Sequence, residues 1–187
     1  MKNRIRLLKS LFLVNSLPHR LNELRITLIT LITFLFAGCG IYSFSGASIS
    51  PDIKSVTIDF FPNHAAIVQP SLSQAFTERM KEKFVSQTSL RLLDKDGDLH
   101  FEGSITDYST QPVAILGTQT AALSRLTITV SVKFTNAKDD KQNFESSFTR
   151  YYEYQSSLSL TSVEQAAITE INKQLVDDIF TRAVSNW

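Results

Sequence analysis

The stretch Arg125-Leu-Thr-Ile-Thr-Val-Ser-Val-Lys-Phe134 decides the fold, because apolar and polar residues alternate along its whole length. Successive side chains of a β-strand point to opposite faces of the sheet, so the pattern predicts a strand with one buried and one polar face. The buried face is expected to hold Leu126, Ile128, Val130, Val132 and Phe134. Such a strand needs paired neighbours and an apolar layer over its buried side.

Three other segments alternate in the same way and are predicted to be strands of the same sheet. They are Ser55–Phe60, Leu99–Ile105 and Phe144–Tyr154, while Leu90–Leu93 is a candidate for a further short strand. Neighbouring strands in sequence usually pair as antiparallel hairpins.

The segment Asp94–Asp98 separates two of these strands and is rich in aspartate. A calcium loop of the EF-hand type needs glycine at its sixth position and an acid at its twelfth. Here Gly97 stands fourth and Ile105 twelfth, so we predict a hairpin turn rather than a calcium site. Asn136–Lys141 is predicted to be a second, charged turn.

Two segments have the period of an amphipathic helix. Pro70–Gln87 carries one apolar stripe, and Ser162–Ala183 carries another after Thr161-Ser-Val-Glu164, which fits a capping box. The stripes are Leu72, Phe76, Met80 and Phe84 in the first helix and Ile168, Ile171, Leu175, Ile179 and Ala183 in the second. We therefore predict an α+β fold, a two-layer sandwich with both helices packed on one face of a mostly antiparallel four-stranded sheet.

The N-terminal part differs in composition from the remainder. Basic residues are concentrated before an apolar run, Ile26–Ala37, which ends in small residues. This order is typical of a secretory signal, and the run is shorter than the roughly 20 residues of a membrane-spanning helix. We predict that residues 1–38 are a lipoprotein signal peptide.

Cys39 is the only cysteine of the 187 residues and follows Gly38 directly. The run Leu35-Phe36-Ala37-Gly38-Cys39 resembles the bacterial lipobox, departing from it at Phe36. Acylation would make Cys39 the first residue of the mature protein and anchor it in a membrane, since each buried acyl CH₂ contributes about 0.8 kcal/mol. The alternatives are a buried thiol or a chance cysteine after an ordinary signal. Residues 39–51 are then a lipidated tether, and 52–187 a single α+β domain.

Little in the sequence suggests an enzyme. After the signal the chain has His64 and His100, which do not share a metal-ligand spacing, and no phosphate loop or nucleophile elbow. We expect no catalytic residue, no metal and no cofactor apart from the covalent lipid on Cys39. The remainder after the signal is mildly acidic, so we expect no nucleic-acid partner.

Two features call for a protein partner. The first is the apolar stretch Pro112–Gly117, with Val113, Ile115 and Leu116, which either folds back on the core or inserts into another molecule. The second is the polar sheet face, which is either a plain solvated surface or a hydrogen-bonding interface. Its members are Thr127, Thr129, Ser131, Glu145, Ser147, Thr149 and Tyr151.

Taken in order, several segments resemble the Bacteroidetes branch of the LptE-type lipoproteins of lipopolysaccharide assembly. They are Cys39–Gly46, Ser55–Asn63, Arg125–Val130, Phe144–Phe148 and Asp178–Trp187. The resemblance implies two helices on a four-stranded sheet and a protein that is not an enzyme. It also implies a plug and assembly aid within a large outer-membrane β-barrel of the LptD type, which helps to deliver lipopolysaccharide to the cell surface.

Some members of that family bind lipopolysaccharide through basic residues, for which Arg125 and Lys133 are the candidates here. Val113, Ile115, Leu116, Thr127 and Thr129 are the candidates for contacting the barrel. The expected location is the periplasmic side of the outer membrane. No acidic run, which would signal export to the cell surface, follows Cys39. The next residue is Gly40, whereas an aspartate there signals retention in the inner membrane of some bacteria. The alternative is a periplasm-facing lipoprotein that binds an amphiphile or another envelope protein without a barrel.

Overall fold

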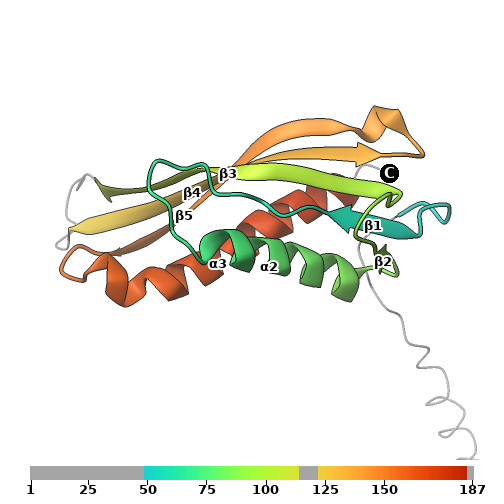
Figure 1. Ribbon diagram of the computed structural model, residues 1–187. Helices are drawn as coiled ribbons and strands as arrows, with labels where there is room; N and C mark the ends of the chain where they lie inside the picture. The colour runs from blue at the N-terminus through green and yellow to red at the C-terminus, as the bar shows by residue number, and fades with distance from the viewer. Residues whose placement is uncertain (1–48, 114–121, 185–187) are drawn as a thin grey trace, which may run out of the picture. The chain divides into compact units, whose positions relative to one another are not determined.

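The computed structural model describes residues 49–113 and 122–184 (Figure 1). Cys39, Ile115 and Leu116 lie outside these ranges, as do the predicted signal peptide and most of the tether. None of the helices in the described ranges is long and apolar enough to cross a membrane. The elements are β1 (Ser55–Ile58), α2 (Leu72–Gln87), β2 (Arg91–Leu92), β3 (Leu99–Val113), β4 (Leu123–Asn136), η1 (Asp140–Gln142), β5 (Phe144–Gln155) and α3 (Leu160–Val184).

The strands form one mixed sheet in the order β2-β1-β3-β4-β5. β3, β4 and β5 make two antiparallel ladders, whereas β1 runs parallel to both of its neighbours. The α+β prediction is confirmed, but the prediction of a mostly antiparallel four-stranded sheet is wrong in its details. The extra strand is β2. The chain passes through α2 between β1 and β2, and this helical crossover lets β2 pair with the edge of β1 in the same direction.

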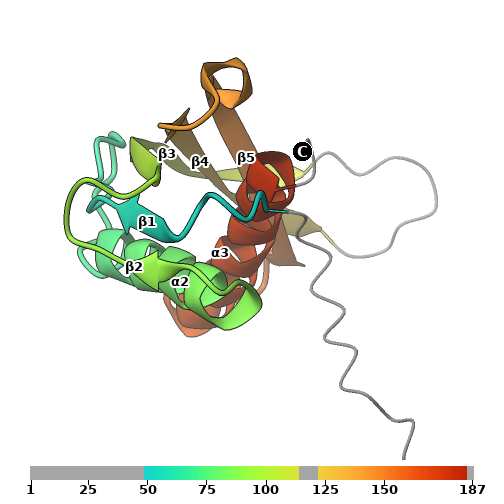
Figure 2. The same ribbon diagram turned by 90° about the vertical axis from the view of Figure 1, so that its right-hand side faces the viewer.

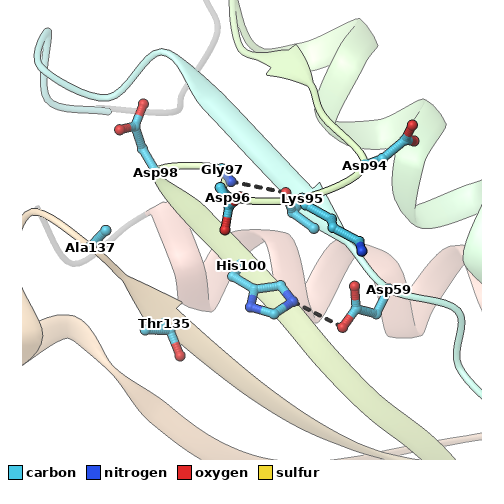
Figure 3. A pocket seen from close by; sticks show the side chains of 10 residues that line it. Asp59, Asp94, Lys95, Asp96, Gly97, Asp98, His100, Thr135 and Ala137 are labelled. Carbon is cyan, nitrogen blue, oxygen red and sulfur yellow. Dashed lines mark hydrogen bonds and ion pairs between the residues drawn. The ribbon is translucent and has the colours of Figure 1, made fainter.

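The segment Asp94–Asp98 is not a hairpin turn, which corrects the prediction. It joins β2 to β3, two strands that flank β1 and run in its direction, so it crosses β1 (Figure 3). Gly97 touches β1 there, because a Cβ at this position would lie 2.6 Å from the backbone nitrogen of Thr57. The hairpin predicted at Asn136–Lys141 is present and contains η1.

Both helices cover the same face of the sheet (Figure 2). The predicted stripes of α2 and α3 are buried, as is the apolar row of β4 from Leu126 to Phe134. The predicted capping box is wrong: α3 already begins at Leu160, and the Glu164 carboxylate accepts a hydrogen bond from the Tyr108 hydroxyl instead. The stripes of both helices are therefore buried against one sheet face, and the opposite sheet face is left open.

Candidate functional site

The open face of the sheet is built by the polar side chains that alternate with the buried row of β4. The ladder places each of them beside a polar residue of β5. The pairs are Arg125 with Glu153, Thr127 with Tyr151, Thr129 with Thr149, Ser131 with Ser147, and Lys133 with Glu145. The hydroxyl oxygens of Thr129 and Thr149 lie 2.9 Å apart, in hydrogen-bond contact. The structure thus brings together the polar residues that the sequence placed on one face.

Arg125 lies at one end of this face. Its Nη2 is 2.5 Å from the Glu153 Oε1, and its guanidinium carbon lies 4.1 Å from the centre of the Tyr151 ring. The guanidinium is therefore held in place by a carboxylate and an aromatic ring on the neighbouring strand. An anionic ligand would have to compete with Glu153 for it.

Lys133 lies at the other end of the open face. Its Nζ is 2.6 Å from the Glu102 Oε1 on β3, and this pairing lowers the pKa of Glu102 and raises the pKa of Lys133. Eight residues of extended chain separate Lys133 from Arg125, a distance of about 26 Å at the usual rise per residue. The two basic groups are thus too far apart to bind one phosphate together.

Val113, the one apolar candidate among the described residues, lies at the far end of the β3–β4 hairpin. The sequence predicted that the first of these strands ends at Ile105, but β3 continues to Val113, which pairs with Leu123. Thr110, Gln111 and Pro112 are exposed there and Val113 is partly buried. Ile115 and Leu116, which follow in sequence, are outside the described residues.

A cleft that the sequence did not predict lies where Asp94–Asp98 crosses β1 (Figure 3). It has a volume of about 570 Å³ and is lined mainly by charged and polar residues, among them Asp59, Lys95, Asp96 and His100. The His100 Nε2 lies 2.9 Å from the Asp59 Oδ2. The one sign of this cleft in the sequence was the set of alternating aspartates in Asp94–Asp98. The cleft itself forms because this segment crosses β1, and the pattern of polar and apolar residues does not predict such a crossing.

Asp98 is among the residues that line this cleft, and its carboxylate binds the chain at the start of β1. Its Oδ2 accepts hydrogen bonds from the backbone nitrogens of Lys54 and Ser55 and from the Ser55 hydroxyl. These bonds, with Lys138 nearby, lower the pKa of Asp98 to about 2. Among the residues with described positions, no three histidine, cysteine or acidic side chains are arranged to hold a metal ion.

Comparison with solved structures finds several proteins with limited similarity to this chain. A minor lipoprotein from Acinetobacter baumannii is 13% identical, with a TM-score of 0.48 over 72% of this chain and 94% of that one. A hypothetical protein from Chlamydia trachomatis is 8% identical, with a TM-score of 0.49 over 72% of this chain and 99% of that one. The rare lipoprotein B from Shewanella oneidensis is 14% identical, with a TM-score of 0.41 over 71% and 95%.

No curated protein matches the chain. The assignment rests instead on a protein-family model, LptE, described as lipopolysaccharide-assembly, which matches residues 53–183. The match spans all five strands, α2 and almost all of α3, and so concerns the whole domain and not one motif. The chain belongs to the LptE family of lipopolysaccharide-assembly proteins.

Proposed function

We propose that the chain is an outer-membrane lipoprotein that plugs a large β-barrel of the LptD type and helps it to assemble. In that role it would aid the delivery of lipopolysaccharide to the cell surface without acting as an enzyme. The observation that carries the proposal is the match to the lipopolysaccharide-assembly family over residues 53–183. Because the chain belongs to this family, we expect it to bind a β-barrel protein and lipopolysaccharide.

The open face of the sheet suits contact with a barrel wall. Its threonines and serines can bond to polar groups or to trapped water, and protein interfaces of this polar kind are common. The helices offer little for a partner, because their apolar stripes are buried against the sheet. We therefore propose that Thr127 and Thr129 contact the barrel, together with Val113, Ile115 and Leu116 at the hairpin end.

Site-directed photo-crosslinking tests this contact in intact membranes. A crosslinker at Thr129 should capture a large barrel protein, whereas one at Lys81 on α2 should capture it much less often. Changing Val113, Ile115 and Leu116 together to Ser should weaken co-purification of the barrel and leave the domain folded. Crosslinks concentrated at Lys81, or a Ser variant that unfolds, would count against the proposed contact.

We also propose that Arg125 and Lys133 contact acidic groups of lipopolysaccharide. Each is held by a carboxylate, so the lipid must displace Glu153 or Glu102. A sharp test is Glu102→Gln, which frees the Lys133 ammonium without removing it. Lipopolysaccharide binding should strengthen in Glu102→Gln and weaken in Lys133→Ala, with Lys81→Ala as the matched control. An unchanged affinity in all three variants would leave Lys133 as an ordinary surface charge.

The anchor proposed for this function is a lipid on Cys39, with the domain on the periplasmic side of the outer membrane. Mass spectrometry of the mature N-terminus decides the first point, since an unmodified Cys39 contradicts it. Protease treatment of intact cells decides the second, because digestion without permeabilisation would place the domain outside. Purification from detergent without any barrel would favour a lipoprotein with a different envelope partner.

A further inference from the structure

β5 is the last strand of the sheet, and its outer edge has no partner within the described residues. The strand runs for 12 residues, from Phe144 to Gln155. It pairs with β4 in one unbroken register, from Phe144 opposite Phe134 to Gln155 opposite Leu123. Its other side therefore offers a long, continuous row of backbone donors and acceptors, which is a template for another strand.

The last hydrogen bond of the β4–β5 ladder identifies the residues of β5 whose backbone N–H and C=O groups point away from β4. The Ser156 nitrogen donates to the Ala122 oxygen at 2.9 Å, so Ser156 continues the ladder as a hydrogen-bonded pair. Such pairs alternate along an antiparallel ladder, so the even-numbered residues of β5 direct their backbone groups toward β4. The odd-numbered residues direct theirs outward: Glu145, Ser147, Thr149, Tyr151, Glu153 and Gln155.

The other exposed edges of this sheet carry features that discourage pairing. β2 is only two residues long. The unpaired part of β3 follows a register shift between Ile105 and Asp107 and contains Pro112. Short strands, bulges and edge prolines are the usual means by which proteins protect such edges.

β5 lacks these means, because it contains no Pro, no Lys and no register shift. A charged side chain on the covered face of an edge strand can also discourage pairing, and Arg150 is placed there. However, the Nε and Nη2 groups of Arg150 donate to the two carboxylate oxygens of Asp178 on α3, with N–O distances of 2.6 and 2.7 Å. The charge is thereby neutralised within the domain, and the edge is left open.

The side chains of β5 indicate what kind of strand would fit. On the helix side, Phe144, Phe148 and Tyr152 are only partly buried, so a neighbouring strand with apolar residues would cover them. On the open face, Lys133 hydrogen-bonds to Glu102, and Glu145 has no hydrogen-bonded cation among the described residues. A cation on the added strand would complete this row of charges.

We propose that β5 accepts an extended segment of another protein as a sixth strand. The segment carries apolar residues toward α3 and Lys or Arg residues on the open face, opposite Glu145. This contact is distinct from the barrel contact proposed for the open face, because it uses the backbone edge. It requires main-chain hydrogen bonds for affinity and alternate side chains for specificity.

A second copy of β5 fits the edge poorly. An antiparallel pair related by a two-fold axis at Thr149 would oppose Glu145 to Glu153, and an axis at Arg150 would oppose that residue to itself. Like charges directly opposite each other destabilise a strand pair. No register of two β5 strands places a cation opposite Glu145, because the side chains of β5 on the open face include no Lys or Arg.

The test titrates the full chain in detergent with a synthetic peptide that alternates Lys and Val. The matched peptide alternates Glu and Val. The Lys peptide should bind at least about tenfold more tightly, a difference of about 1.4 kcal/mol. It should also slow the hydrogen exchange of the Ser147, Thr149 and Tyr151 amides, which point outward.

Two variants separate the edge from the rest of the surface. Ser147→Pro removes an outward N–H and should abolish binding, whereas Ser147→Thr keeps the N–H and should bind normally. Glu145→Lys should reverse the preference toward the Glu peptide, and this holds even if the proline variant fails to fold. The proposal is overturned if a folded Ser147→Pro chain binds unchanged or if Glu145→Lys leaves the preference as it was. Crosslinking of β5 to a second copy of β5 would likewise overturn it.

Discussion

Replacing Asp98 with Asn tests the account of how β1 is held. The Asp98 carboxylate receives two backbone N–H groups and one hydroxyl from the start of β1, and Lys138 lies 3.2 Å from its other oxygen. Asn keeps the shape of the side chain but loses the charge and turns one acceptor into a donor. The variant therefore removes the electrostatic part of the contact with little change in packing.

The size of the effect follows from the pKa. Folding lowers the pKa of Asp98 from 3.8 to about 2, and each unit corresponds to about 1.4 kcal/mol. This difference corresponds to about 2.5 kcal/mol. Solvent screens the charge, because the side chain keeps 20% of its surface in water, so its contribution is about 2 kcal/mol or less. We expect Asp98→Asn to lower the free energy of unfolding at neutral pH by between about 1 and 2 kcal/mol.

The pH dependence provides a second, independent signature. Because the folded pKa lies below the unfolded value, the contribution is complete above about pH 4 and is lost as the pH falls toward 2. Urea unfolding of both proteins across this range measures it. The two stabilities should converge at low pH, while Asp94→Asn, an exposed change on the same segment, should match the unchanged chain throughout. A difference between Asp98→Asn and the unchanged chain that persists at low pH would refute the electrostatic explanation.

Four further substitutions should change stability in defined directions, each measured by chemical or thermal unfolding. Phe76→Ala or Ile171→Ala removes a fully buried side chain and should cost about 2–5 kcal/mol, whereas a loss below about 1 kcal/mol would contradict the packing described. Asn172→Leu should stabilise the domain by about 1 kcal/mol, because the buried Asn172 Oδ1 has no hydrogen-bond partner among the described residues, and destabilisation would argue against this account. Gly103→Ala should prevent stable pairing of β3 and β4, since a Cβ there would lie far inside contact distance of the Ser131 oxygen, and a folded variant of unchanged stability would disprove this expectation.

The sequence alone was sufficient for the features that depend on local period. The alternation from Arg125 to Phe134 identified β4 and its buried row, and the four-residue spacing in α2 and α3 identified the stripes that the structure buries. From these the two-layer α+β arrangement followed, because each apolar stripe must be covered by another apolar surface. The same alternation placed four polar residues on one face of the sheet: Arg125, Thr127, Thr129 and Lys133.

Only the tertiary structure decided which strands are neighbours and which side chains are in contact. Leu90–Leu93 was a candidate strand, and β2 falls on it. Periodicity is the same whether a strand pairs in parallel or antiparallel, so it could not report the direction of β1, the position of β2 beside β1 or the crossing at Asp94–Asp98. Strand order also determined which carboxylates hold Arg125 and Lys133 and left β5 at an open edge. These properties depend on contacts between residues far apart in the chain, and a local pattern of polar and apolar residues contains no information about them.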